Sequence, residues 1–598
     1  MPETALSPQV GAEGVVQISI FSGGALVPDN VQLLSVSISR AINKIPRARL
    51  ALLDGDMPSQ SFPLSDADHF KPGAVIKISA GYGGNQEPLF EGIVIKHSIS
   101  IAGDNKSQLL VECCDQAARM TVGRNSASYK DQSDADIIKA LISANGLQAD
   151  VPSTSITHKM LVQHYCSDWD FILARANANG LLVVVTDGKI SVKPPQADSA
   201  PTLKCSYGLD LMSFHGELDA RTQWASAQAF AWDMANQKVV EADAPAAVLN
   251  AQGNIKSSEL AKVLDMRANR LQSAAPIPEP ELTVWAKAAQ LKAGLARVRG
   301  RMTFQGSAKA IVGGLIEVDG VGERFNGKVF VSAVNHKIAE GNWTTDVEFG
   351  MWPEWHAERS DVVAPPASGL LPGVNGLQIG VVSQLHDDPE GQNRVQVTLP
   401  LHGVGAGGVW ARLAMPYASQ EAGIFLMPEI GDEVVLGYFG NDPSYPVIIG
   451  SLYSSARPTP YSLQNDNNIK AIVTRSKSKI EFNDQDKIIT VTTPGNNQII
   501  LNDKDQSIQL IDQNDNKVEL TPSGISLDSR KDIRINAKGS IAIDAAGKID
   551  ITSKADVLSS GLNVKCDAQV AFVGRGNAKA ELLSSGTTTV KGAMVIIN

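Results

Sequence analysis

Cysteine, aromatic residues and long apolar runs are scarce in this sequence, and each scarcity excludes a class of protein. The 598 residues include five cysteines, of which Cys113 and Cys114 are adjacent, and no C-x-x-C pair. A disulfide framework and a zinc cluster are therefore not expected. No apolar stretch approaches the ~18–20 residues that a membrane span needs. We expect no stable insertion into a membrane.

Basic charge in excess is also missing. The net charge is −10, with charged residues at 19% and aromatic residues at 5%. That balance argues against nucleic acid as a partner. The first residues, 1–5, have neither the basic start nor the apolar stretch of a signal peptide. We expect assembly in a reducing cytoplasm, followed by delivery outside the cell by a route that needs no signal peptide.

Motifs for catalysis, cofactors and metals fail on their context. Residues 322–328 have the Gly-x4-Gly-Lys spacing of a phosphate loop, but Val329 replaces the Ser or Thr that would hold magnesium. Residues 403–408 match G-x-G-x-x-G without a following helix pattern. The nine histidines form no H-x-H or H-E-x-x-H pair, and His386 beside Asp387 and Asp388 is interpreted as an exposed turn. We predict no catalytic residue, no cofactor and no metal ligand.

Residues 1–363 combine strand patterns with helical patterns, which predicts a hub of β domains with helical insertions. Short strands are expected at 75–79, 109–112, 328–331 and 346–349. Helices are expected at 134–147 with Ser133 as N-cap, at 168–178, at 257–271, and at 281–298 with Gly300 as the stop.

Residues 364–375, rich in proline and small residues, are predicted to be a linker. Residues 376–453 contain several short strands with turns, which indicates a small barrel. An oligonucleotide-binding (OB) fold would suit that length. The barrel has two basic residues, Arg394 and Arg412, and eight acidic ones. A groove that follows phosphates needs the opposite sign.

A connector at 454–479 leads to the most regular part of the chain, residues 480–598. Apolar residues there come as i, i+2 pairs, first every nine or ten residues and then every eight. A short fixed period of this kind predicts a β-solenoid or β-prism. The candidate core consists of the octad residues Ile525, Leu527, Ile533, Ile535, Ile541, Ile543, Ile549, Ile551 and Val557.

The repeat also predicts an oligomer. A very short strand with one apolar face exposes that face and its unpaired edges when it stands alone. Three intertwined chains would bury the face and pair the edges, at roughly 1.5–3 kcal/mol for each buried Ile, Leu or Val. A single-chain β-helix is the alternative, although eight residues per turn are few to enclose a core.

Two regions resemble a known family. The barrel resembles the OB domain of spike proteins of contractile injection machines, and the hub resembles VgrG proteins. The barrel likeness rests on Gly380–Val382, Asp388–Glu390, Arg394–Val397, Trp410–Arg412, Pro428–Val435, Asn441–Pro446 and Gly450–Tyr453. The hub likeness rests on Ser167–Ile172, Gly180–Leu181 and Phe325–His336.

The resemblance implies a mainly β fold with some α: a hub of β-barrel-like domains, an OB barrel and a trimeric intertwined needle. It implies a homotrimeric, non-enzymatic spike that caps the inner tube of Hcp-like protein, sits among baseplate proteins and pierces a target envelope. A PAAR-type tip protein, with possible effector cargo, would bind the end of the needle. The candidate tip contacts are Gly592, Ala593, Met594, Val595, Ile596, Ile597 and Asn598.

Two other functions stay open at this point. A tail-fibre or adhesin-like needle that binds a receptor shares the trimeric prism, but we expect it to end in a globular receptor domain. A baseplate-associated cell-wall hydrolase would need a catalytic cluster within the first ~360 residues. The spacing between barrel and needle is too short for an inserted enzyme domain.

Overall fold

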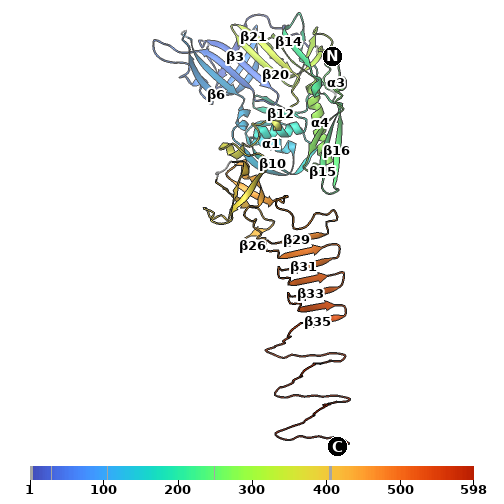
Figure 1. The fold of residues 1–598 in the computed structure, drawn as a ribbon. Helices are drawn as coiled ribbons and strands as arrows, with labels where there is room; N and C mark the ends of the chain where they lie inside the picture. The colour runs from blue at the N-terminus through green and yellow to red at the C-terminus, as the bar shows by residue number, and fades with distance from the viewer. Residues whose placement is uncertain (1–4, 29, 104–105, 248, 403–406, 598) are drawn as a thin grey trace. The chain divides into compact units, whose positions relative to one another are not determined.

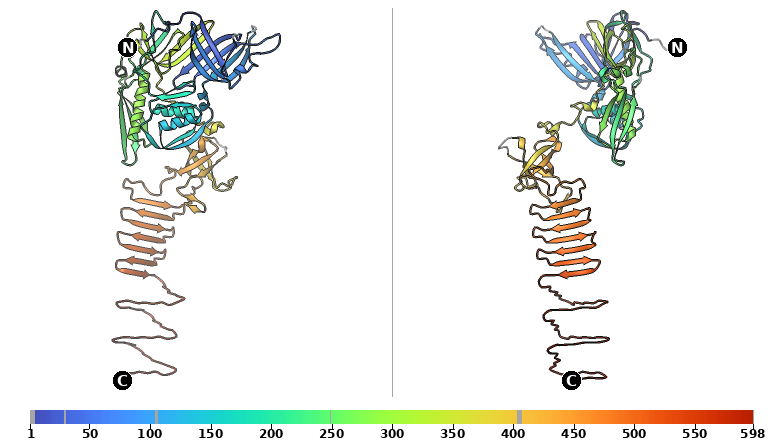
Figure 2. Two further views of the ribbon diagram at one scale, coloured as in Figure 1. Left: turned by 180° about the vertical axis from the view of Figure 1, so that it is seen from behind. Right: turned by 45° about the vertical axis from the view of Figure 1, so that its right-hand side comes forward.

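The computed structural model describes residues 5–28, 30–103, 106–247, 249–402 and 407–597. The chain divides into two compact units, Met1–Leu452 and Tyr453–Asn598. Figures 1 and 2 show the elements of each unit. The fold is mainly β with a few helices, as the sequence predicts.

A 13-stranded sheet is the scaffold of the first unit. Its main path runs β14-β18-β21-β20-β3-β4-β7-β6-β5-β1-β2, and β19 joins β20 and β13 at the side. The strands are β1 Val16–Ser22, β2 Ala25–Leu26, β3 Leu33–Ala41, β4 Arg47–Leu53, β5 Val75–Tyr82, β6 Asn85–Ile101, β7 Ser107–Cys114, β13 Leu203–Ser206, β14 Leu211–Leu218, β18 Val298–Gln305, β19 Leu315–Asp319, β20 Gly327–Ala339 and β21 Asn342–Phe349.

Alternation along these strands builds the core. In β3 and β4 every second side chain is buried, with Val36, Ile38, Leu50 and Leu52 almost inaccessible to solvent. Period-2 burial of this kind places one face of a strand on the core. The residues 322–328 that mimic a phosphate loop form a turn that leads into β20, so the structural interpretation of that motif is confirmed.

A first α+β module follows β7. It contains β8 Asn125–Ser133, α1 Asp134–Ala144, β9 Gln148–Asp150, β10 Thr157–Cys166, α2 Asp168–Ala178, β11 Leu182–Thr186 and β12 Lys189–Lys193. The Oγ of Ser133 accepts from the N–H of Asp136 at 3.2 Å, which confirms the predicted N-cap. Both predicted helices in this module are present, and the first ends three residues early.

A second module corrects two helix predictions. It contains β15 Ser226–Asp233, β16 Lys238–Pro245, α3 Ser257–Val263, β17 Ala268–Ser273 and α4 Glu279–Leu295. The helix predicted at 257–271 ends at Val263, because the chain from Ala268 pairs in parallel with β15 and Leu271 joins the core there. The helix predicted at 281–298 ends at Leu295.

Gly300, expected to stop that helix, lies instead inside β18 opposite Gly216. A Cβ at Gly300 would lie 2.0 Å from the carbonyl oxygen of His215. Glycine is therefore required at this position because two strand backbones approach each other closely. In the sequence Gly300 looks like the end of a helix, but the requirement comes from tertiary structure.

The predicted barrel is present as a closed ring in the order β22-β23-β24-β28-β27. Its strands are β22 Gln378–Gln384, β23 Val395–Thr398, β24 Val409–Leu413, β27 Glu433–Tyr438 and β28 Pro446–Ser451, and a small hairpin joins β25 Ala418–Ser419 to β26 Ala422–Gly423. Valine, leucine, isoleucine and alanine fill its interior. In the segment predicted as a linker, Ala367 is buried and the N–H of Val374 donates to the carbonyl of Asn441.

The second unit begins with a seven-stranded antiparallel meander, in which each strand pairs with the next one along the chain. The strands are β29 Ile469–Val473, β30 Lys479–Asn483, β31 Ile488–Thr492, β32 Gln498–Asn502, β33 Ser507–Ile511, β34 Lys517–Thr521 and β35 Gly524–Asp528. The first strand lies inside the segment predicted as a connector. Residues 529–597 continue as extended segments that reverse direction repeatedly (Figure 2).

Candidate assembly surface

The meander of the second unit has one apolar face, built by register. Ile480 lies opposite Val491, and Ile499 lies opposite Val491 and Leu510. Each strand from β30 to β35 adds two apolar side chains to the same face, so they form two parallel columns. We call this surface the apolar stripe: Ile480, Phe482, Ile489, Val491, Ile499, Leu501, Ile508, Leu510, Val518, Leu520, Ile525 and Leu527.

The opposite face of the meander is mainly polar, although Ile488, Ile500 and Ile511 also lie on it, and several of its polar side chains pair with one another. Lys479 Nζ lies 2.7 Å from Glu481 Oε2, and Lys517 Nζ lies 2.8 Å from Glu519 Oε2. Gln509 donates to Glu519 Oε1 at 2.7 Å. Its side chains are less accessible than those of the apolar stripe. The apolar stripe is therefore the more exposed face of the single chain, and it is the face that lacks a cover.

Exposure of the apolar stripe is large for a folded sheet. Ile480 is 39% exposed, Leu510 44% and Leu527 58%. Burial of one such side chain contributes roughly 1.5–3 kcal/mol. A continuous apolar surface of this extent on a single chain marks an interaction surface.

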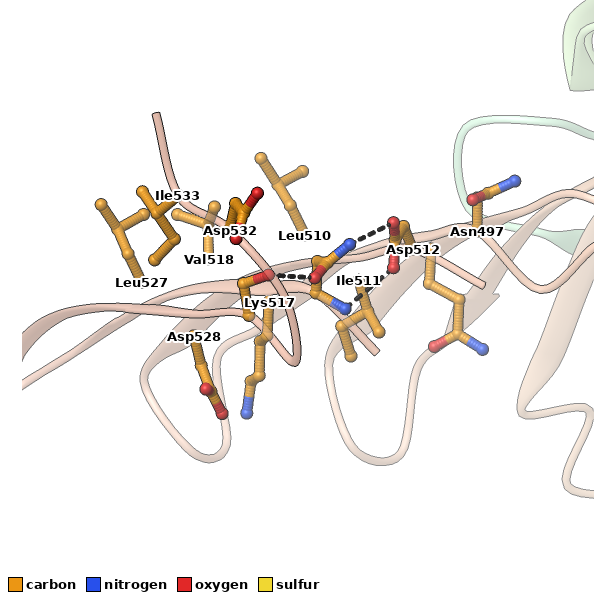
Figure 3. A pocket seen from close by; sticks show the side chains of 13 residues that line it. Asn497, Leu510, Ile511, Asp512, Lys517, Val518, Leu527, Asp528, Asp532 and Ile533 are labelled. Carbon is orange, nitrogen blue, oxygen red and sulfur yellow. Dashed lines mark hydrogen bonds between the residues drawn. The ribbon is translucent and has the colours of Figure 1, made fainter. Parts of the chain in front are cut away.

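The apolar stripe ends at a hollow of about 410 Å3. Figure 3 shows the side chains that line it. Leu510, Val518, Leu527 and Ile533 form its apolar wall. The polar rim is a hydrogen-bonded turn, in which Asn516 Nδ2 donates to Asp512 Oδ2 at 2.8 Å and Ser529 Oγ donates to Asn516 Oδ1 at 2.6 Å. Hydrogen bonds from the side chain and backbone of Asn516 lower the pKa of Asp512 to about 2.

The structure places the predicted core residues in two settings. Ile525 and Leu527 lie on β35, within the apolar stripe. The other seven, Ile533, Ile535, Ile541, Ile543, Ile549, Ile551 and Val557, lie on extended segments, and all are at least half exposed. Within residues 529–597 the chain forms no strand with itself. The predicted octad strands are therefore absent from the single chain, because their backbone groups have no partner there.

The sequence prediction missed the start of this surface. Ile472 on β29 lies opposite Ile480 and extends one column of the apolar stripe. Its partner position in the other column is Lys470, which lies opposite Phe482. The i, i+2 apolar pair is thus broken in β29, and no repeat signal was available from the sequence.

The candidate tip residues resemble the octads in their environment. Gly592, Ala593, Met594, Val595, Ile596 and Ile597 are exposed and belong to no strand. Asn598 lies outside the described residues, as do 403–406 of the Gly-rich motif. Their role in binding a tip protein stays a prediction.

The barrel offers no free basic groove in its described part. Arg394 Nη2 lies 2.6 Å from Asp388 Oδ1 and 3.2 Å from Glu390 Oε1, and these bonds hold the pKa of the Asp388 carboxyl well below its usual range. Arg412 faces the ring of Phe439. His386 Nδ1 pairs with Asp387 at 2.6 Å. Among the described residues, no group of three His, Cys, Asp or Glu side chains is arranged to hold a metal.

No helix in the described ranges is both long and apolar enough to cross a membrane.

Comparison with known proteins assigns the two regions of the first unit. Residues 12–340, more than half of the chain, match the family model of the Alg8 N-terminal domain. Residues 378–453 match the type VI secretion system/phage-baseplate injector OB domain. The second match covers the closed barrel from its first strand to its last.

The chain is also similar to individual proteins. The chain is 28% identical over 151 residues to the type VI secretion system spike protein VgrG4b of Pseudomonas aeruginosa, a match that covers 23% of this chain and 19% of that protein. Among solved structures it matches an E. coli component of the type VI secretion system, which is described as structurally similar to the T4 bacteriophage tail proteins gp27 and gp5. That match has a TM-score of 0.35 and 13% identity, and it covers 72% of this chain and 99% of that one.

The closed barrel is an OB domain of the kind found in type VI secretion system and phage-baseplate injectors. The chain belongs to the family described by the Alg8 N-terminal domain, and it is similar to VgrG spike proteins. Its matched part spans only about a fifth of the length of the curated VgrG relative.

Proposed function

We propose that the protein works as a homotrimer whose C-terminal repeats form a needle. The observation that carries this is the apolar stripe, with two side chains per strand in register over six consecutive strands. Three copies around one axis would turn their stripes inward and leave the three polar faces in water. The burial would then stabilise the assembly along its whole length.

The octad segments support the same arrangement. Their backbone N–H and C=O groups find no strand partner within residues 529–597 of one chain. Buried backbone groups must be paired, so burial of Ile541 and its equivalents requires strands from other copies. In this region the three chains intertwine, whereas in the meander each chain contributes a sheet of its own.

A closed prism of this kind transmits force, and we infer a mechanical role from it. The trimer caps the inner tube of Hcp-like protein at the baseplate, and contraction drives the needle through a target envelope. The type VI and baseplate matches support these partners. The apolar residues 592–597 would hold a PAAR-type tip with its cargo. A chain truncated before Gly592 should stay trimeric but fail to retain the tip protein in a pull-down.

The spike itself performs no catalysis in this proposal, because stability and shape supply the function. Zymography of the pure trimer against peptidoglycan tests this directly. A cleared band at the position of the full chain would replace the mechanical role with that of a hydrolase.

Native mass tests the trimer. We expect light scattering to give three times the chain mass, and we expect the complex to survive mild SDS at room temperature. Ile541→Asp places a charge on the apolar face of an octad, and Ala542→Asp places the same charge one residue along, on the other face. The first variant should lose SDS resistance while the second keeps it. A monomeric wild-type chain, or equal behaviour of both variants, would contradict the proposal.

A further inference from the structure

The hub contains a cavity of about 650 Å3 that no part of the spike assembly described above uses. Its walls come from Lys292 of α4, from β14, β18 and β20, from residues 41–44 at the end of β3, from Asn177 of α2, and from the end of β21 with the residues up to 359 that follow it. Gly350, with φ +72°, turns the chain sharply over β18, where a Cβ would meet the carbonyl of Val298 at 2.2 Å. This turn brings Trp352 and Trp355 to the cavity.

Arg299 on β18 enters the cavity wall with donors unused. Its side chain is 6% exposed, and its Nη2 pairs with Glu217 Oε1 at 2.8 Å and with Asp219 Oδ2 at 3.3 Å. Its Nε and Nη1 are buried and make no hydrogen bond. A buried donor without a partner costs free energy. Folding therefore leaves two donors of Arg299 without an acceptor in the described part of the chain.

Lys292 on α4 is a second cation with unused donors in the same cavity. Its Nζ donates to Asn177 Oδ1 at 2.8 Å and lies 4.9 Å from the ring centre of Trp355. In the described part of the chain it forms no ion pair, and burial lowers its pKa to about 8. The carboxylates of Glu358 and Glu354 act on this ammonium and partly offset the effect of burial, but neither is within ion-pair distance of it, so the buried charge lacks the direct partner that such groups normally have.

The rim of the cavity has the character of a protein contact. Trp352 lies over the guanidinium of Arg299, with the Cζ 3.5 Å from the ring centre, yet this tryptophan is 64% exposed. Exposed tryptophan next to arginine is typical of the residues that dominate binding at protein interfaces. A flat apolar ring beside unused donors suits a segment that presents both an apolar side chain and a carboxylate.

We propose that this cavity binds an acidic peptide segment of a separate protein. A carboxylate of the segment accepts from the free donors of Arg299 and Lys292, and a neighbouring apolar side chain packs on Trp352. Charge complementarity favours this occupant. The lining carries more basic side chains (Lys44, Lys292, Arg299, Arg301 and Arg359) than acidic ones (Glu217, Glu348 and Glu354), and carboxylates form charge-assisted hydrogen bonds with Lys and Arg. The inference does not depend on the trimer or on the needle.

Anisotropy with the full-length protein tests the site. The probe is a fluorescein-labelled pentapeptide of alternating glutamate and leucine, blocked at both ends, and the control peptide has glutamine in place of glutamate. We expect the acidic peptide to bind at least about tenfold more tightly than the control peptide, as for loss of a buried charge contact. Equal binding of the two peptides would overturn the proposal.

Variants locate the binding. Trp352→Ala removes an exposed ring and should fold, and Lys292→Met removes the charge but keeps the chain length; each should weaken the acidic peptide about tenfold. Arg267→Gln removes an equally charged but exposed residue away from the cavity and should change nothing. Unchanged binding in both cavity variants would refute the site. If Trp352→Ala instead alters the native mass and no peptide binds, the face is a contact between copies and the proposal is wrong.

Discussion

The two halves of the repeat region use the same apolar i, i+2 pairs and yet form different structures. In β29–β35 the chain pairs with itself, strand by strand. In residues 529–597 it forms no strand within one chain, although Ile541 and Ile543 repeat the pattern of Ile499 and Leu501. The comparison teaches that the apolar pair alone does not decide strand pairing.

Hydrogen-bonded turns distinguish the two regions, whereas connection length alone does not, because β34 and β35 pair although only Pro522 and Ser523 join them. In the meander, residues 484–487 and 493–497 form turns with internal bonds, such as Asn483 Oδ1 accepting from the N–H of Asp486 at 3.1 Å. These polar turns reverse the chain by about one strand width, so that successive strands meet. From Ile525 the repeat is eight residues, with Gly539 and Gly547 at equivalent places, and no such turn bonds are present between Ile533 and Ile551.

The largest effect should appear in amide hydrogen exchange. In a chain dissociated by Val491→Lys together with Ile541→Asp, we expect residues 530–597 to exchange at rates close to those of an unfolded chain. Residues 469–528 should keep protection higher by about two orders of magnitude, since their hydrogen bonds lie within the chain. Equal protection of the two segments in the dissociated chain would remove the distinction.

A charge in the octads should cost more than the same kind of change in the meander. In the trimer, Ile541→Asp places three carboxylates in one enclosed core, at a penalty of several kcal/mol for each chain. We expect the needle to melt from this end, with loss of SDS resistance. Thermal unfolding followed by circular dichroism of this variant, beside Ala542→Asp, measures the difference. An unchanged melting temperature for Ile541→Asp would mean that the octads do not form a core.

Within the meander, the effect should depend on the face. Val491→Lys removes an apolar side chain from the stripe and should destabilise assembly by about 1.5–3 kcal/mol per chain. Thr490→Lys introduces the same residue on the polar face, opposite Glu481, and should have little effect. Urea titration of the trimer distinguishes the two. If both variants lose the same stability, the stripe is not the buried face.

The smallest expected effect is the dependence of stability on pH, which should differ between the hub and the repeats. Burial lowers the pKa of His336 to about 3, whereas the free side chain has a pKa near 6.5. Between these values the unfolded chain binds a proton that the folded chain does not, so hub stability falls as the pH falls below 6.5, by at most about 1.4 kcal/mol per pH unit. No histidine follows His402, so this contribution is absent from the repeats.

His336→Gln should reduce the acid dependence of the hub's melting temperature between pH 7 and 5. Calorimetry of both proteins at matched pH provides the measurement. An identical pH slope in the variant would show that other groups govern the acid response of the hub.

Local chemistry in the sequence determined much of the architecture. Ser133 before an acidic, amphipathic stretch specified α1, since a cap and one apolar face are properties of neighbouring residues. Alternation and turn residues specified the barrel, and the period of eight to ten specified a repeat structure. These signals act over a few residues, and no tertiary contact is needed to recognise them.

Tertiary structure decided what depends on residues far apart in the chain. Only pairing with β15 shows that Ala268–Ser273 is a strand, and only the neighbouring strand explains Gly300. The cavity joins Lys292 and Arg299 to Trp352 across three segments, and nothing in the local pattern marks them. The apolar pairs in the sequence were enough to determine that the repeat region has an apolar stripe that must be covered. Strand register determined that it is one continuous face, because a shift of a single residue would have turned every second side chain to the other side.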